Sequence, residues 1–84
     1  MSHARDVAET VILALVDRPQ AVRVTETAGR DGAVIEVSVG SDDLGRVIGR
    51  QGRTATAIRT LVAATAEREG MHVSVEFRDE HGQR

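Results

Sequence analysis

Hydrophobic side chains recur at two spacings along the 84-residue chain, and the spacing predicts helices in some segments and strands in others. Apolar residues lie three to five positions apart over residues 4–16 and 53–68, which is typical of helices with one buried face. Pro19 ends the first helix, because proline disfavours helical backbone in the residue before it, and Gly70 ends the second. The predicted core stripes are Val7, Ala8, Val11, Ile12 and Leu15, then Ala55, Ile58, Leu61, Val62 and Thr65.

Alternating apolar and polar residues predict three strands, over residues 21–27, 33–39 and 71–78. Each strand therefore has one buried and one solvated face, and residues 29–32 form a hairpin turn between the first two. The side chains expected to face the core are Val22, Val24, Ile35, Val37, Val39, Val73, Val75 and Phe77.

A third, short helix is predicted to open at residues 40–43 and to stop at Gly49. Ser41 is the expected N-cap, and two aspartates, Asp42 and Asp43, favour the positive end of the helix dipole. The resulting order is α-β-β-α-α-β. The predicted fold class is α+β, a two-layer domain with a three-stranded mixed sheet covered by three helices. The long connection before the last strand permits a parallel crossover if the second and third strands are neighbours.

Length and composition narrow the functional classes. A chain of 84 residues makes one small domain, which self-association would help to stabilise. It has no cysteine, so disulfides and thiolate metal sites are excluded, and its three histidines are too scattered to predict a metal site. There is no membrane-spanning apolar run and no signal-peptide pattern, so a cytoplasmic protein is expected.

Positive charge is concentrated in one window of the sequence. The net charge is −2, yet all 13 acidic residues lie outside residues 44–66, where four of the 11 arginines gather. The window therefore carries +4 and the remainder, with 11 − 4 = 7 arginines against 13 acids, carries −6. An anionic ligand is expected to bind at this window.

Within the window, Gly49-Arg50-Gln51-Gly52 joins two predicted helices. Its glycines permit positive φ and a close backbone approach, and the amides at the start of the next helix favour a phosphate. The simpler alternative is an ordinary helix-turn-helix connection. A phosphate-binding P-loop is excluded, because that motif needs a lysine and the chain has none.

The run Val47-Ile48-Gly49-Arg50-Gln51-Gly52, set between two helices of this chain, resembles the KH domain of bacterial type (type II). The longer run from Gly45 to Val62 is similar to the small stand-alone bacterial KH proteins of the KhpA family. The resemblance covers about residues 4–78. It implies a single type II KH domain over residues 1–84, with residues 79–84 as a frayed tail.

The resemblance implies that the loop clamps the backbone of single-stranded RNA. Gly49, Arg50, Gln51 and Gly52 would form the clamp, Ile48 the apolar floor under a base, and Arg46 and Arg53 the flanking phosphate contacts. The last strand would supply the opposite wall. Many KH domains carry isoleucine where this chain has Ala55, so little base reading is expected. Arg59 is interpreted as a solvated side chain, Gly45 as a helix-packing contact, and Phe77 as too buried to stack on a base.

The implied function is non-catalytic binding of single-stranded RNA with low sequence specificity, as an RNA chaperone or post-transcriptional regulator. No cofactor is expected. The implied partners are RNA and a second KH domain, in a homodimer or a heterodimer. The alternative is a dimerisation module that contacts RNA incidentally. A third possibility, a nucleotide-binding enzyme, lacks any recognisable catalytic group.

Overall fold

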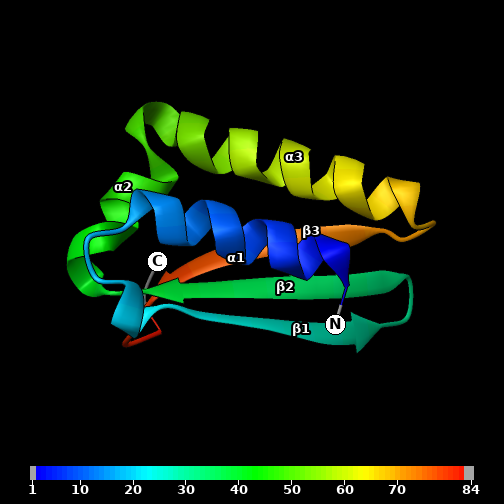
Figure 1. Cartoon of the computed structure of the whole chain (residues 1–84), viewed down its shortest axis with the longest axis horizontal. Helices are drawn as coiled ribbons and strands as arrows, with labels where there is room; N and C mark the ends of the chain where they lie inside the picture. The colour runs from blue at the N-terminus through cyan, green and yellow to red at the C-terminus, as the bar shows by residue number, and fades with distance from the viewer. Residues whose placement is uncertain (1, 83–84) are drawn as a thin grey trace.

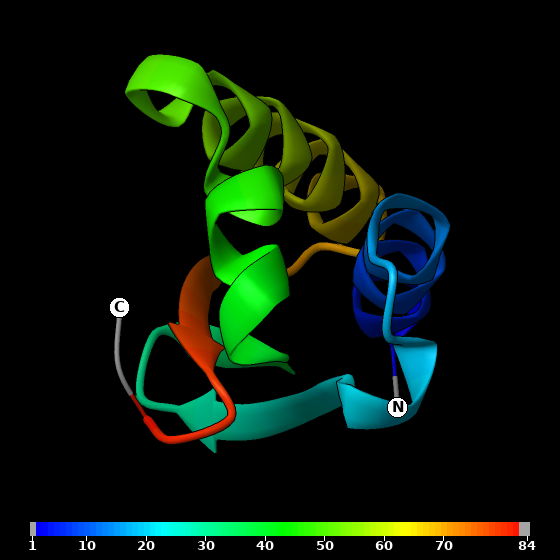
Figure 2. The same cartoon turned by 90° about the vertical axis from the view of Figure 1, so that its left-hand side faces the viewer.

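The computed structural model describes residues 2–82, which form a sheet with helices packed on one of its faces (Figures 1 and 2). The helices and strands follow the predicted order α-β-β-α-α-β. They are α1 (His3–Leu15), β1 (Arg23–Gly29), β2 (Gly32–Val39), α2 (Leu44–Ile48), α3 (Arg53–Arg68) and β3 (Val73–Asp79). One-turn 3-10 segments precede β1, α2 and α3, at Pro19–Ala21, Ser41–Asp43 and Arg50–Gly52.

The sheet is mixed, as predicted, with β2 in the centre. β1 pairs with β2 in the antiparallel direction through the Gly29–Gly32 hairpin, and β3 pairs with β2 in parallel. Ile35 of β2 lies opposite Glu26 of β1 and Val75 of β3. The connection through α2 and α3 gives the crossover that a parallel pair requires. Both β1 and β3 are edge strands.

The core lies between the inner face of the sheet and the three helices. α1 begins at the N-cap Ser2, whose hydroxyl accepts the amide of Arg5, and it buries one stripe of small and branched residues. Inward residues of all three strands meet this stripe and the inner faces of α2 and α3. The fully packed side chains are Ala4, Ala8, Ile12, Val24, Ile35, Val37, Val39, Val47, Ala55, Ile58, Val62, Ala66, Val75 and Phe77.

The prediction for α3 was wrong at two core positions. Leu61 is 48% exposed and Thr65 is only half-buried, whereas Ala66 is 1% exposed and belongs to the core. The helix is covered on only one side, by α1 and the sheet. That side takes the row Ala55, Ile58, Val62 and Ala66, and Leu61 lies one residue, or about 100°, away from Val62.

Two smaller predictions near α2 were also wrong. Ser41 makes no N-capping hydrogen bond, because Ser41–Asp43 form a separate 3-10 turn and α2 begins only at Leu44. Gly45 is not a helix-packing contact, since a Cβ built there would meet no described atom within 4 Å.

The first strand begins two residues later than predicted, because Pro19–Ala21 turn instead of extending.

Asp43 has a structural role that the sequence did not reveal. It is 1% exposed, and its carboxylate accepts the main-chain amides of Asp17 (3.1 Å to Oδ1 and 3.2 Å to Oδ2) and Arg18 (3.1 Å to Oδ2). These bonds join the start of α2 to the chain leaving α1. The position of α2, and of the loop that follows it, is therefore tied to the rest of the domain.

The chain after β3 turns back on itself as far as Gly82, whose amide donates to the carbonyl of Asp79. Glu80 accepts the amide of Ser41 at 3.2 Å and lies 3.6 Å from the guanidinium of Arg18. Residues 83–84 of the predicted tail lie outside the described residues. The extent of the domain and of its tail therefore stays a prediction.

Candidate nucleic-acid interface

The Gly49–Gly52 loop has an unusual backbone for so short a segment. Gly49 and Gly52 have φ of 79° and 73°, which confirms the predicted positive φ at both glycines. Gln51, between them, also has positive φ (57°), a conformation that costs a side-chain-bearing residue about 1–2 kcal/mol. The turn is closed by the amide of Gly52, which donates to the carbonyl of Gly49 at 3.1 Å.

Gly49 packs closely on the first turn of α3. A Cβ built on Gly49 would lie 2.3 Å from Oγ1 and 2.7 Å from Cβ of Thr54. Gly52 faces open space, with no described atom within 4 Å of a Cβ built there. The first glycine is therefore needed for packing as well as for φ, and the second for φ alone.

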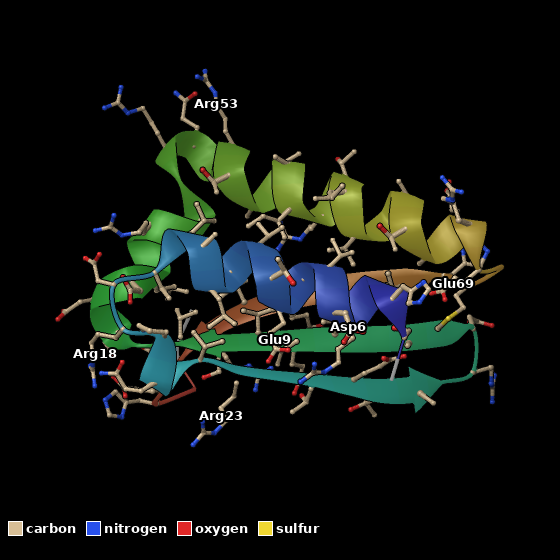
Figure 3. The ribbon with its side chains drawn as sticks, in the orientation of Figure 1. Asp6, Glu9, Arg18, Arg23, Arg53 and Glu69 are labelled. Atoms are coloured by element: carbon tan, nitrogen blue, oxygen red, sulfur yellow. The ribbon has the colours of Figure 1, made fainter. Side chains whose placement is uncertain are left out.

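The polar side chains of the loop point into solvent. The side chain of Arg50 is exposed and, within residues 2–82, makes no hydrogen bond or ion pair. The guanidinium of Arg53 donates to Oε1 of Gln51 at 2.9 Å, and Figure 3 shows Arg53 projecting from the start of α3 away from the sheet. No described side chain caps the N-terminus of α3, where the helix dipole leaves partial positive charge.

Ile48 ends α2 directly before the loop. It is partly buried and packs on the edge of the core, which leaves part of its side chain at the surface beside Gly49. The structure therefore brings together Ile48, the loop residues 49–52 and Arg53. Their roles towards RNA stay predictions.

Arg46 is held away from these residues by acidic partners. Its Nη2 lies 2.9 Å from Oδ2 of Asp17, and its Nε lies 3.5 Å from Oδ1 of Asp43. Its charge is compensated inside the domain before any ligand arrives. Of the four arginines in the acid-free window, it is the one whose guanidinium pairs with carboxylates within the described residues.

Arg59 is exposed, as the sequence suggested, but its guanidinium is held against β3. Its Nε donates to the main-chain oxygen of Val75 at 3.1 Å, and its Cζ lies over the ring of Phe77, 5.0 Å from the centroid. The helical spacing predicted that Arg59 and Arg53 lie on different faces of α3. It could not show that the face of α3 bearing Arg59 lies against the open edge of β3.

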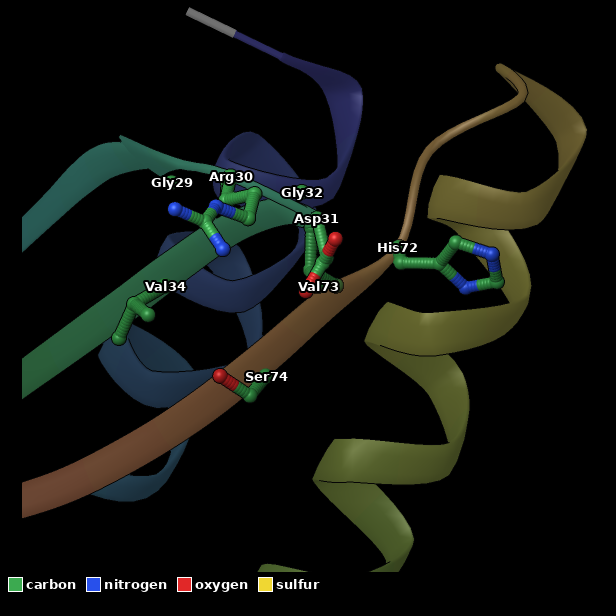
Figure 4. Close-up of a pocket in the computed structure, with 9 residues that line it drawn as sticks. Gly29, Arg30, Asp31, Gly32, Val34, His72, Val73 and Ser74 are labelled. Carbon is green, nitrogen blue, oxygen red and sulfur yellow. The ribbon is translucent and has the colours of Figure 1, made fainter.

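Elsewhere on residues 2–82, no other surface combines unpaired arginines with a helix N-terminus in this way. A hollow of about 380 Å³ lies at the hairpin end of the sheet (Figure 4), lined by Asp31, His72 and Ser74 among others. Figure 4 shows the His72 ring pointing away from Ser74, and no hydrogen bond joins these three side chains in the described structure. Residues 2–82 contain no group of three or more His, Cys, Asp or Glu side chains arranged to hold a metal. They also contain no helix long and apolar enough to cross a bilayer.

A domain of order α-β-β-α-α-β, with a Gly-x-x-Gly loop between its second and third helices, is a KH domain of the bacterial arrangement. The sequence profile of the family described as "KhpA/KhpB, KH domain" matches residues 5–77, and this chain belongs to that family. The predicted fold class and family are thereby confirmed.

Several similar proteins carry the name "RNA-binding protein KhpA". The protein from Caldanaerobacter subterraneus is 49% identical over 72 residues, covering 86% of this chain and 96% of its own length. The protein from Mycobacterium bovis is 51% identical over 70 residues, covering 83% of this chain and 86% of its own. That of Chlamydia pneumoniae is 44% identical over 70 residues, with coverage of 83% and 90%.

Among solved structures, Era from Aquifex aeolicus has a similar fold, with a TM-score of 0.62 and 17% identity. The similarity covers 92% of this chain and only 30% of the Era chain. A second Era structure, in complex with MgGDPNP and nucleotides 1506–1542 of 16S ribosomal RNA, gives the same TM-score, with coverage of 90% and 29%. At this identity the likeness concerns the fold alone.

Proposed function

We propose that this chain binds the backbone of single-stranded RNA through its Gly49–Gly52 loop, with low sequence specificity and without catalysis. One observation carries the proposal. The loop places Arg50 and Arg53, neither paired with a carboxylate in the described structure, beside the uncapped start of α3. Cations beside a helix N-terminus suit phosphate groups. The names of the similar proteins support the same ligand class.

The site residues have different parts in this proposal. Positive φ at Gly49 and Gly52 lets the RNA backbone approach the loop, with Arg50 and Gln51 contacting its phosphates. Ile48 supports a base from below, and Arg53 flanks the next phosphate. Arg46 contributes least, because Asp17 and Asp43 already neutralise it.

The test is the double variant Arg50→Asp with Gln51→Asp, measured by filter retention or crosslinking of single-stranded RNA. We expect RNA retention to fall to background while the circular dichroism spectrum stays unchanged. The matched control is Arg30→Asp with Gln20→Asp. It makes the same two replacements at exposed positions outside the loop, and we expect it to retain RNA.

Retention of RNA by the folded loop variant would contradict the proposal. It would favour the alternative of a dimerisation module whose contact with RNA is incidental. Turnover of a nucleotide by the purified chain would instead contradict the non-catalytic assignment.

We also propose that the 84 residues act as one KH domain that pairs with a second copy or with another KH-containing protein. Leu13 and Leu61 support this, because they are 42% and 48% exposed and both lie on helices. Pairing would also enlarge the RNA surface of a domain with few contacts of its own. Leu13→Glu with Leu61→Glu should then lower the mass measured by sedimentation equilibrium, and an unchanged mass would exclude pairing through these residues.

The cellular role that follows is that of a cytoplasmic RNA chaperone or post-transcriptional regulator. Weak, unselective contacts with many RNAs suit such a role. Sequencing the RNA crosslinked to the protein in its own cell tests it, and the expected result is a broad set of transcripts. A single dominant target would argue against a general chaperone.

A further inference from the structure

The open edge of β3 is partly covered by one arginine of α3. The carbonyl of His72 accepts the amide of Ala33 in β2, so the alternate residues Val73, Val75 and Phe77 direct their main-chain groups to the unpaired edge. Arg59 donates its Nε–H to the carbonyl of Val75 on that edge. An unpaired strand edge presents a regular row of main-chain donors and acceptors. Arg59 occupies one of these acceptors, the Val75 carbonyl, and places its own guanidinium donors at the edge.

The guanidinium of Arg59 is held in place and still has donors to offer. The Val75 carbonyl takes one of its five N–H groups, which leaves four on Nη1 and Nη2. The ring of Phe77, 1% exposed, supports the guanidinium carbon at 5.0 Å. Arg59 itself is exposed, and no carboxylate in residues 2–82 pairs with it. The free end of the guanidinium is therefore available to a ligand with two adjacent acceptors.

Arg59 also lies within reach of a strand held at the loop. Gly52, the N-cap of α3, lies seven residues before Arg59, or about 10 Å along the helix axis. A strand whose backbone is held at Gly49–Gly52 can continue along α3 towards β3. A base of that strand would then meet the guanidinium.

We propose that Arg59 is a specificity-determining residue that reads a base with two adjacent acceptors, guanine or cytosine, in the bound strand, an inference that rests on the RNA binding proposed above. Guanine presents two adjacent acceptors, O6 and N7, which match the two remaining nitrogens of the guanidinium. Cytosine also presents two adjacent acceptors, N3 and O2, on its Watson–Crick edge, which is open in a single strand. Adenine places its N6 amino donor between N7 and N1, and uracil places its N3–H donor between O4 and O2, so neither offers two adjacent acceptors to a donor pair.

The test uses fluorescein-labelled octauridine carrying one central guanosine, adenosine, cytidine or 7-deazaguanosine, with binding measured by fluorescence anisotropy. The unmodified protein should bind the guanosine and cytidine oligonucleotides about tenfold more tightly than the adenosine one, the ratio expected for one bidentate pair between an arginine and a base. The 7-deazaguanosine oligonucleotide lacks the N7 acceptor and should lose most of that advantage.

Two variants separate base reading from a structural role. Arg59→Ala should bring the guanosine-to-adenosine ratio close to one. Arg59→Lys, which keeps the charge without the planar fork, should lower the ratio while leaving octauridine binding nearly unchanged. Arg5→Ala is the matched control, because Nη2 of Arg5 donates to the Val24 carbonyl on the opposite sheet edge at 2.9 Å. We expect Arg5→Ala to preserve the ratio.

The outcomes distinguish this inference from the proposed function. Equal binding of all four oligonucleotides by the unmodified protein would overturn base reading by Arg59 and leave RNA binding intact. A uniform loss of affinity in Arg59→Ala with the ratio preserved would also overturn it, since that result shows a stacking or purely electrostatic contact. Failure to bind any oligonucleotide would contradict the proposed function itself.

Discussion

Gly49 lies so close to Thr54 that a Cβ built on the glycine would come within 2.3 Å of the threonine Oγ1 and 2.9 Å of its main-chain nitrogen. The contact joins the end of α2 to the first turn of α3 across the loop. Because the obstructing atoms include backbone and Cβ, the neighbour cannot simply swing away. The loop conformation is thus enforced by packing, in addition to the φ values of its glycines.

This contact predicts different results for the two glycines. Gly49→Ala adds a clash to the penalty for positive φ and should lower the free energy of unfolding by about 2–4 kcal/mol. Gly52→Ala has the φ penalty alone, since its Cβ would meet no described atom within 4 Å, and should cost about 1–2 kcal/mol. Urea denaturation of both variants measures the difference. Equal losses would show that Thr54 does not constrain Gly49.

The buried carboxylate of Asp43 predicts a second pair of variants. Asp43→Ala leaves the amides of Asp17 and Arg18 without their acceptor, and should lower the free energy of unfolding by about 2–4 kcal/mol. Asp42→Ala changes the same residue type at an exposed position and should cost less than about 0.5 kcal/mol. Thermal unfolding followed by circular dichroism distinguishes the two. A similar melting temperature for both variants would show that Asp43 does not anchor α2.

The orientation of α3 can be tested at two adjacent residues. Val62 is fully buried and Leu61 is exposed, so Val62→Ala should lower the free energy of unfolding by about 1–3 kcal/mol. Leu61→Ala should change it by less than about 0.5 kcal/mol for the isolated domain. Both are measured by urea denaturation at low protein concentration, where self-association contributes least. A larger loss at Leu61 would restore the original prediction that it belongs to the core.

Salt dependence can rank the arginines around the loop. Each phosphate contact on single-stranded RNA contributes about −0.7 to the slope of log K against log salt concentration. With about two to four contacts, the whole domain should show a slope of about −1.4 to −2.8. Arg50→Gln and Arg53→Gln should each make the slope shallower by about 0.7, whereas Arg46→Gln should change it little, because Asp17 and Asp43 already hold that side chain.

The measurement is a binding titration at several potassium chloride concentrations, with Arg30→Gln as the control for an exposed arginine at the hairpin. If Arg46→Gln changes the slope as much as Arg50→Gln, then RNA displaces Asp17 and Asp43 from Arg46. The secondary role proposed for Arg46 would then be wrong.

The order of elements, the Gly29–Gly32 hairpin, the bounds of α3 and the positive φ at Gly49 and Gly52 could all be predicted from the sequence. These features depend on local properties, namely the period of the apolar residues and the conformational freedom of glycine. The inward row of β2, Ile35, Val37 and Val39, followed for the same reason. The family could be identified as well, because its motif is contiguous along the chain.

Other features depended on which surfaces meet in space. Whether Leu61 or Ala66 enters the core depends on how α3 is rotated against α1 and the sheet. Asp43 is buried because the chain after α1 passes over it, and Arg46 is neutralised by Asp17, which is 29 residues away. Arg59 touches Val75 and Phe77 only because the parallel crossover places β3 beside α3. Local spacing carries no information about these contacts, because they arise when distant segments pack, and they decide which arginines remain free for RNA.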